Sequence, residues 1–287
     1  MSIVRRSLFY SMLGANGVIA LQFVATVVLA RLLTPSEFGV YSVAAVFVAL
    51  ATIFRELGIG NYLVQVSHLT EQTLRAAHGL LLISATVLGI SLLLIAELIA
   101  GFFREPAIKP IIEVLALNFF IAPLGAIALS VARREMRFRA LMVVNFLSAA
   151  AGSITSILLA YNGYGPVSLA WGGVAGTLVS AMCALFLRRP GQPWLPGLQG
   201  AREILVFGSS SVGANLLGSL NTNAPDAVIG RLLGMEPVGF LNRARTFSSF
   251  VSRSLNSTIR PVLLPWLSQL RRDSVPPAPA FLKVTEL

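Results

Sequence analysis

Long apolar stretches recur along the whole chain and limit the folds that it can adopt. Runs of about 18 or more mostly apolar residues alternate with short charged or Gly/Pro-containing segments, as in helices that cross a hydrocarbon layer about 30 Å thick. A membrane β-barrel would need strict two-residue alternation, which the sequence lacks. Hydrophobic residues make up 55% of the chain and charged residues only 12%. The sequence therefore predicts an all-α, polytopic membrane helix bundle.

We predict about eight spanning helices, divided by recognisable turn signals. Thr34-Pro35-Ser36-Glu37 is a capping box with proline at the first helical position, which starts a helix. The Asn-Gly-Tyr-Gly-Pro sequence at residues 162–166 marks a tight hairpin. The first apolar run is as long as a full span, so we expect an uncleaved helix rather than a signal peptide. The expected spans are residues 12–30, 38–54, 78–103, 111–131, 141–161, 165–187, 204–230 and 240–267.

Basic residues are distributed unequally between the two sides of these spans. With the N-terminus in the cytoplasm, 13 Lys and Arg residues fall on cytoplasmic segments and four on the opposite side. The positive-inside rule then predicts a cytoplasmic N-terminus. This asymmetry also accounts for most of the net charge of +10, so nucleic acid is not expected as a partner.

Chemical motifs are sparse. The single Cys183 permits no internal disulfide, the two histidines have no neighbouring ligands, and no GxxxxGK[ST] phosphate loop is present. We therefore expect no cofactor, no metal site and no enzymatic activity.

The phrase Arg-Leu-Leu, followed six residues later by Gly, occurs at residues 31–39 and again at 231–239. Between residues 27–45 and 227–245, six positions are identical without a gap. Both copies fall between the first and second helix of a block, and six predicted helices separate the blocks. An even number gives both copies the same orientation, which predicts a parallel repeat. We predict a first six-helix lobe at 1–190, two helices of a second lobe at 191–270 and a Pro-rich polar tail at 271–287.

Six stretches carry a family resemblance that covers nearly the whole chain. They are ARLLTPSEFGVYSVAAVFVALATIFRELGIGNYLVQ, LTEQTLRAAHGLL, RREMRFRAL, VFGSSSVGANLLGSLN, IGRLLGMEPVGFLNRA and PVLLPWLSQLRRD. These stretches resemble the polysaccharide biosynthesis proteins, the O-antigen and exopolysaccharide flippases of the Wzx type. The resemblance implies twelve or more helices in two lobes around a central cavity. Because helices nine onward of that pattern are missing, we expect a C-terminally truncated member.

The resemblance also implies a function. We expect a flippase in the bacterial inner membrane that moves polyprenyl-diphosphate-linked oligosaccharide to the periplasmic leaflet for surface polysaccharide biosynthesis. Membrane lipid and the polysaccharide polymerase and export proteins are the further partners expected. Two alternatives remain. One is a cation-coupled drug antiporter, from the superfamily to which these flippases belong, which should show a carboxylate-rich cavity. The other is a non-transporting fragment. A glycosyltransferase or polymerase would need a DxD-like carboxylate pair or a large periplasmic loop, and the sequence has neither.

Cations on the eighth predicted helix are the main candidates for substrate binding. Arginine suits a diphosphate because its planar fork bonds two oxygens and stays charged, and a charge within a span usually faces a cavity. Opposite an apolar face, the helix presents a polar stripe with helical spacing. The stripe consists of Arg245, Ser249, Arg253, Asn256 and Arg260. Snorkelling to the surface is the alternative for Arg260, and capping a periplasmic helix end is the alternative for Arg245.

Further candidates lie on the second and seventh predicted helices. Asn221, Asn223 and Asp226 surround Pro225, which should kink the helix and expose backbone to the cavity. Asp226 is expected to be a counter-ion for Arg243 or Arg245, an ion-coupling site, or part of a structural ion pair. Arg243 is a further candidate for a substrate-binding cation of the cavity. Arg55 ends the second helix just before Gly58 and Gly60, and the resemblance to the lipid II flippase places it in the cavity; an ordinary cytoplasmic anchor is the alternative.

Overall fold

The computed structural model describes residues 3–66, 68–188 and 195–248, with the side chains of all these residues except 3–15, 210, 211 and 214. Within these ranges the regular structure is helical. The helices are α1 (Ile3–Leu32), α2 (Pro35–Glu56), α3 (Ile59–Gln65), α4 (Glu71–Phe103), α5 (Ile108–Arg134), α6 (Phe138–Tyr161), α7 (Val167–Leu187) and α8 (Ala201–Leu233), and residues 235–248 are also helical.

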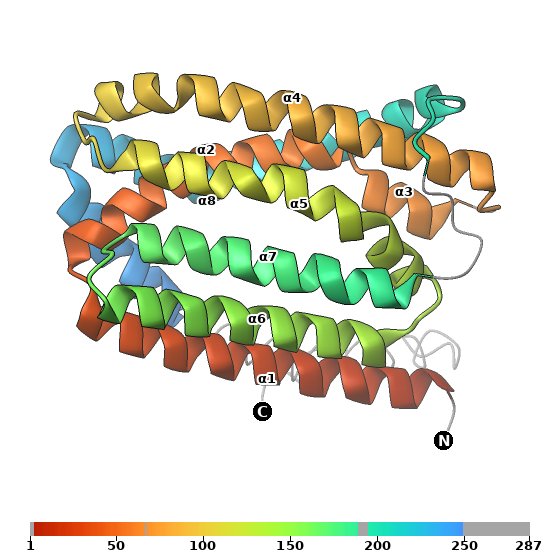
Figure 1. The fold of residues 1–287 in the computed structure, drawn as a ribbon, viewed down its shortest axis with the longest axis horizontal. Helices are drawn as coiled ribbons and strands as arrows, with labels where there is room; N and C mark the ends of the chain where they lie inside the picture. The colour runs from red at the N-terminus through yellow and green to blue at the C-terminus, as the bar shows by residue number, and fades with distance from the viewer. Residues whose placement is uncertain (1–2, 67, 189–194, 249–287) are drawn as a thin grey trace, which may run out of the picture.

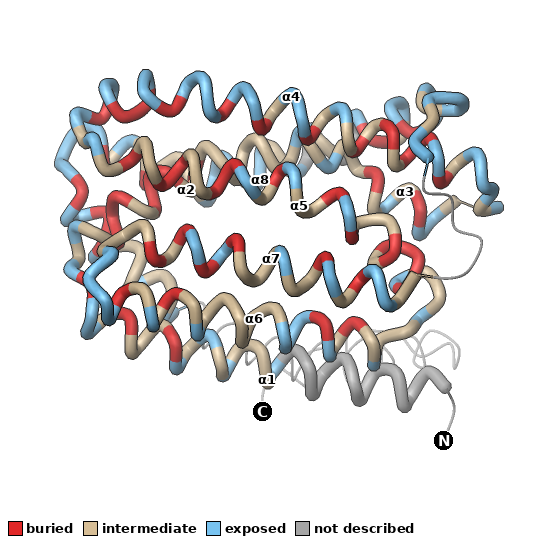
Figure 2. Tube along the Cα trace, in the orientation of Figure 1, coloured by how far each residue is buried: buried red, intermediate tan, exposed pale blue. Residues whose placement is uncertain are grey.

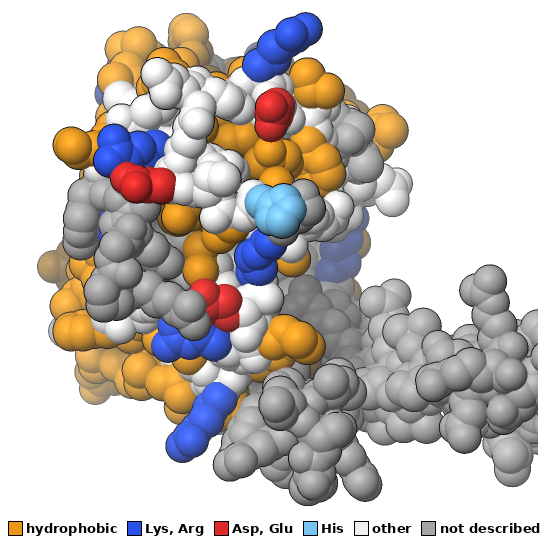
Figure 3. Space-filling view, turned by 90° about the vertical axis from the view of Figure 1, so that its right-hand side faces the viewer, with side chains coloured by type: hydrophobic (Ala, Val, Ile, Leu, Met, Phe, Trp, Pro, Cys, Tyr) orange, Lys and Arg blue, Asp and Glu red, His pale blue; other side chains and the backbone are white. Residues whose placement is uncertain are grey.

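Successive long helices run in opposite directions, so their ends gather at two opposite ends of the bundle (Figure 1). Figure 3 shows one of these ends, with basic side chains spread over it. We call this end, which includes the turns between α5 and α6 and between α7 and α8, the arginine-rich end. Its described basic residues are Arg55, Arg75, Arg133, Arg134, Arg137, Arg139, Arg188 and Arg202, whereas Arg31, Arg104, Lys109 and Arg231 lie at the opposite end.

Apolar residues occupy both the interior and much of the outer surface. Figure 2 shows that the long helices carry both buried and exposed residues along their length. Val43, Ile112 and Phe119 are fully buried where α2, α4 and α5 meet, whereas Leu94 on α4 is 74% exposed and Phe186 on α7 is 89% exposed. A soluble protein rarely exposes so much apolar surface. Five helical stretches of the described chain are long and apolar enough to cross a membrane. The predicted all-α membrane bundle is thus confirmed, while the number of spans stays a prediction.

The predicted capping box at the start of α2 is confirmed. The Thr34 backbone amide donates to Glu37 Oε2 at 2.7 Å, and the Glu37 amide donates to Thr34 Oγ1 at 3.3 Å. Pro35 occupies the first helical position, where it loses no hydrogen bond.

The end of α2 differs in one respect from the prediction. Leu57 and Gly58 adopt left-handed conformations, with φ of 44° and 64°, and they end α2 as expected. The chain then resumes a helix at once, as α3, which the sequence interpretation missed. Seven residues are too few to show a helical period, and Gly58 and Gly60 suggested a break without a further helix.

The two copies of the repeated phrase contact each other. A Cβ atom added to Gly39 would overlap the carbonyl oxygen of Met235, and one added to Gly239 would overlap that of Pro35. At the offset of 200 residues, Pro35 corresponds to Met235 and Gly39 to Gly239. The contact is therefore reciprocal, as across a two-fold axis. This reciprocity supports the internal repeat, and the division into two lobes stays a prediction.

Candidate functional site

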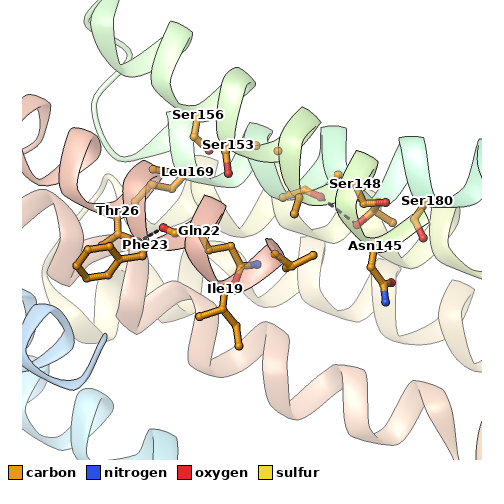
Figure 4. A pocket seen from close by; sticks show the side chains of 18 of the residues that line it. Ile19, Gln22, Phe23, Thr26, Asn145, Ser148, Ser153, Ser156, Leu169 and Ser180 are labelled. Carbon is orange, nitrogen blue, oxygen red and sulfur yellow. Dashed lines mark hydrogen bonds between the residues drawn. The ribbon is translucent and has the colours of Figure 1, made fainter. Parts of the chain in front are cut away.

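A cavity of about 1110 Å³ lies between α1, α6 and α7, with α5 and α2 contributing to its walls. We call it the polar cavity. Figure 4 shows its labelled side chains from α6 and α7, among them Ser148, Ser153 and Ser180, near Gln22 and Thr26 of α1. Thr246, from the helical residues 235–248, also lines it.

Hydroxyl and amide side chains on one face of α6 contribute polar groups to a wall that also contains apolar residues. These polar side chains are spaced by three, five and three residues, which keeps them on the same side of a helix. These residues are Asn145, Ser148, Ser153 and Ser156, and Thr177 and Ser180 of α7 add two more hydroxyl groups. Ser148 Oγ is buried and has no hydrogen-bond partner in the described structure. Such groups can donate to and accept from the hydroxyl groups of a sugar.

Glycines bring α6 and α7 together behind this wall. A Cβ atom on Gly152 would lie 2.9 Å from the carbonyl oxygen of Gly172, and one on Gly176 would lie 3.0 Å from that of Ser148. The backbones therefore approach closely, as small residues permit in membrane helices.

Arg133 is the one charged residue that lines the polar cavity in the described part of the chain. It also lines a second cavity of about 240 Å³, which we call the side cavity. Leu129, Thr177 and Ser180 line both cavities, so the two adjoin at this point. No carboxylate lines the polar cavity among the described residues, so its electrostatic preference is for anions.

Arg55, predicted from the sequence, lines the side cavity. Its side chain is 13% exposed, its Nη2 lies 3.3 Å from Glu56 Oε1, and its guanidinium stacks 5.2 Å from the centre of the Phe119 ring. The carboxylate of Glu56 therefore offsets part of the positive charge of Arg55. Arg55 is therefore placed as predicted near a cavity, and its role in binding stays a prediction.

Asp226 and Arg245 form an ion pair between α8 and the helical residues 235–248. Arg245 Nη1 donates to Asp226 Oδ1 at 2.6 Å and to the Thr222 carbonyl oxygen at 3.2 Å. Asp226 is 7% exposed and Arg245 37%. The helix α8 continues through Pro225, and Thr222 lies in the turn that this proline disturbs. The geometry favours the structural role for this pair among the alternatives that the sequence left open.

Three other predicted residues, Arg243, Asn221 and Asn223, do not line the polar cavity. Arg243 Nη2 donates to the Leu33 carbonyl oxygen at 2.7 Å and stacks 4.8 Å from the Phe38 ring centre, so it joins the two copies of the repeat. Asn223 lines a groove between α2 and α8 and donates to Ser219 Oγ at 2.9 Å. Asn221 is exposed on α8. The predicted residues Ser249, Arg253, Asn256 and Arg260 lie outside the described residues, and their roles stay predictions.

Sequence reasoning missed two parts of this site. Arg133 was counted only among the cytoplasmic basic residues, and the polar face of α6 was not singled out. The sequence did contain a signal for the polar face of α6, since Asn145, Ser148, Gly152 and Ser156 follow helical spacing within an apolar segment. For Arg133 the spacing alone gives no signal, because three further arginines lie within six residues.

These features define a polytopic helical membrane protein that encloses a polar cavity with a positive charge at one end. The chain belongs to the polysaccharide biosynthesis protein family, whose model matches residues 28–287.

Several curated proteins are similar over most of the chain. The succinoglycan biosynthesis transport protein ExoT of Rhizobium meliloti (strain 1021) is 26% identical, over 99% of this chain and 58% of its own length. The lipopolysaccharide biosynthesis protein WzxC of Escherichia coli (strain K12) is 26% identical, over 90% of this chain and 53% of its own. The teichuronic acid biosynthesis protein TuaB of Bacillus subtilis (strain 168) is 23% identical, over 93% of this chain and 56% of its own.

The chain thus spans little more than half the length of these relatives. No solved structure matches it.

Proposed function

We propose that this chain moves a polyprenyl-diphosphate-linked oligosaccharide across the bacterial inner membrane, as all or part of a flippase for surface polysaccharide biosynthesis. The observation that carries the proposal is the polar cavity, where hydroxyl and amide groups stand among apolar side chains and, of the described residues, a single arginine provides charge. An oligosaccharide needs many neutral hydrogen-bond partners, and a diphosphate needs a cation. The names of three relatives refer to the biosynthesis of three polysaccharides, and one of the three relatives is named as a transport protein.

A drug antiporter is less well supported. Recognition of cationic drugs would favour carboxylates in the cavity, whereas the described lining of the polar cavity holds Arg133 and no Asp or Glu. The polysaccharide polymerase and export proteins are the further partners that this proposal implies.

Transport can be measured with the purified chain in liposomes. The substrate would be undecaprenyl-diphosphate-linked oligosaccharide with a fluorophore on the glycan, and dithionite would quench the label in the outer leaflet. We expect the chain to expose the inner-leaflet label faster than protein-free liposomes do, because the polar cavity shields the glycan from acyl chains. A labelled phosphatidylethanolamine is the control and should not be accelerated. Equal rates for the glycolipid with and without protein would refute transport by this chain.

The proposed orientation places the N-terminus and the arginine-rich end in the cytoplasm. In a Cys183→Ser background, we expect Tyr164→Cys to react with a membrane-impermeant maleimide in spheroplasts, because the α6–α7 turn would face the periplasm. Gln199→Cys, at the opposite end, should react only after permeabilisation. Both side chains are exposed, so burial does not separate them. The reverse labelling pattern would contradict the orientation.

A further inference from the structure

Four arginines lie close together where α5 ends and α6 begins, and two of them bind the ends of other helices. Arg134 Nη1 donates to the carbonyl oxygens of Leu63, Val64 and Val66 at 2.9, 3.2 and 2.5 Å, at the end of α3. Arg137 Nη1 donates to the carbonyl oxygen of Leu187, the last residue of α7, at 3.2 Å. Carbonyl groups at helix C-termini carry partial negative charge and attract cations. These two arginines therefore have structural roles.

Arg133 differs from these two neighbours. Its side chain is exposed, and within the described residues its guanidinium makes no hydrogen bond or ion pair. Arg133 lies where the polar cavity meets the side cavity, beside Thr177 and Ser180. One residue along a helix corresponds to a rotation of about 100°. That rotation directs Arg134 to α3 and leaves Arg133 at the cavities.

An unpaired guanidinium at this junction has the chemistry of an anion site. Its planar fork can hold two phosphate oxygens at once, through two charge-assisted hydrogen bonds. Arg55 lines the same side cavity, but its charge is offset by Glu56 at 3.3 Å. The hydroxyl wall of the polar cavity begins beside Arg133, at Thr177 and Ser180. A ligand bound through an anionic group at Arg133 would thus have its polar remainder along that wall.

We propose that Arg133 binds the diphosphate of the lipid-linked oligosaccharide, at the junction of the two cavities, while the glycan occupies the polar cavity. This inference rests on the proposed function and assigns its anion-binding residue. Arg133 is a binding residue, whereas Arg134 and Arg137 hold the helices that surround it.

The test measures binding of undecaprenyl diphosphate to the full chain in nanodiscs, by native mass spectrometry. We expect Arg133→Gln to weaken binding by about tenfold or more, because it removes a charge-assisted, two-pronged contact. Arg133→Lys should give intermediate affinity, since it keeps the charge and loses the fork. Arg202→Gln is the matched control, because Arg202 is exposed at the same end and lines neither cavity. It should bind as the unmodified chain does.

Further arms identify the ligand group and guard against unfolding. Undecaprenol, which lacks the diphosphate, should bind equally to the unmodified chain and to Arg133→Gln. Phosphatidylglycerol should not compete with undecaprenyl diphosphate for the unmodified chain. Inorganic pyrophosphate that bound as tightly as the lipid would assign the site to a free anion and overturn the lipid assignment. Arg133→Gln should melt as the unmodified chain does, whereas Arg134→Gln should melt lower because it releases α3. If Arg133→Gln melts early, Arg133→Lys decides the outcome.

Two negative results have different meanings. If the unmodified chain binds undecaprenyl diphosphate and Arg133→Gln and Arg133→Lys bind it equally well, the assignment of Arg133 is wrong and the proposed function stands. If the unmodified chain does not bind this lipid, the proposed function fails, and the assignment fails with it.

Discussion

Replacing Gly39 by Ala should lower the stability of the chain by about 3 kcal/mol, the cost typical of overpacking a tight contact. The added methyl group would overlap the Met235 carbonyl oxygen, a backbone atom that no side-chain rotation can move. The start of α2 and the helical residues 235–248 would have to separate. Thermal unfolding of the purified protein in detergent, followed by circular dichroism, measures the change.

Two further glycines serve as controls for this prediction. Gly239→Ala should match Gly39→Ala, because its methyl group would overlap the Pro35 carbonyl oxygen on the other side of the same contact. Gly101 lies in α4 with no heavy atom within 4 Å of an added Cβ. Ala there should leave stability unchanged or raise it by up to about 1 kcal/mol through helix propensity. Equal melting of the Gly39 and Gly101 variants would show that the repeat contact is not tight.

Removing either partner of the ion pair between Asp226 and Arg245 should lower the stability of the chain, and the loss should depend on which partner is removed. Arg245→Ala leaves a carboxylate that is 7% exposed without its cation, and should cost about 3 kcal/mol. Asp226→Ala leaves an arginine that is 37% exposed and whose long side chain can turn its charge away from the contact, and should cost about 1 kcal/mol because that charge is not buried. The double variant should resemble Asp226→Ala, since neither charge remains buried alone.

The same variants separate the structural role from ion coupling. Thermal unfolding in detergent gives the three stabilities, and the liposome assay gives transport by each variant. A structural pair predicts that the double variant, once folded, transports at a rate near that of the unmodified chain. Loss of transport at full stability in Asp226→Asn would instead assign the carboxylate to coupling. Equal costs for the two single variants would contradict the unequal burial on which the prediction rests.

Most of the fold could be predicted from the sequence, because long apolar runs and turn signals have few alternative meanings. Most of the long helices extend beyond the predicted spans, as at α4, which begins at Glu71 rather than at residue 78. Apolar content marks only the part of a helix that lies in hydrocarbon, whereas hydrogen bonding and the Thr70 cap continue it into the polar region. The short helix α3 depends on a left-handed turn at Leu57 and on contacts with α5, including the Arg134 hydrogen bonds, which no local pattern encodes.

The site was less predictable than the fold. A charge pattern locates arginines at one end of the bundle. Arg55, a candidate from the sequence, lines the side cavity, and its role in binding stays a prediction. The sequence could not distinguish Arg133 from Arg134, because their roles depend on which neighbouring element each side chain meets. The sequence offered Asp226 as a counter-ion for Arg243 or Arg245. Only the packing of α8 on the helical residues 235–248 brings Asp226 Oδ1 and Arg245 Nη1 to 2.6 Å.

The close approach of α6 and α7 limits how this protein can diversify. Gly152, Gly172 and Gly176 each meet backbone or hydroxyl atoms of the facing helix, so larger residues are disfavoured at these positions. Asn145 and Ser153 line the polar cavity on the same face of α6, and the atoms that they present there can be exchanged without disturbing the contact. A lineage that switches from one sugar repeat to another is therefore expected to vary at the latter two positions while it retains the three glycines.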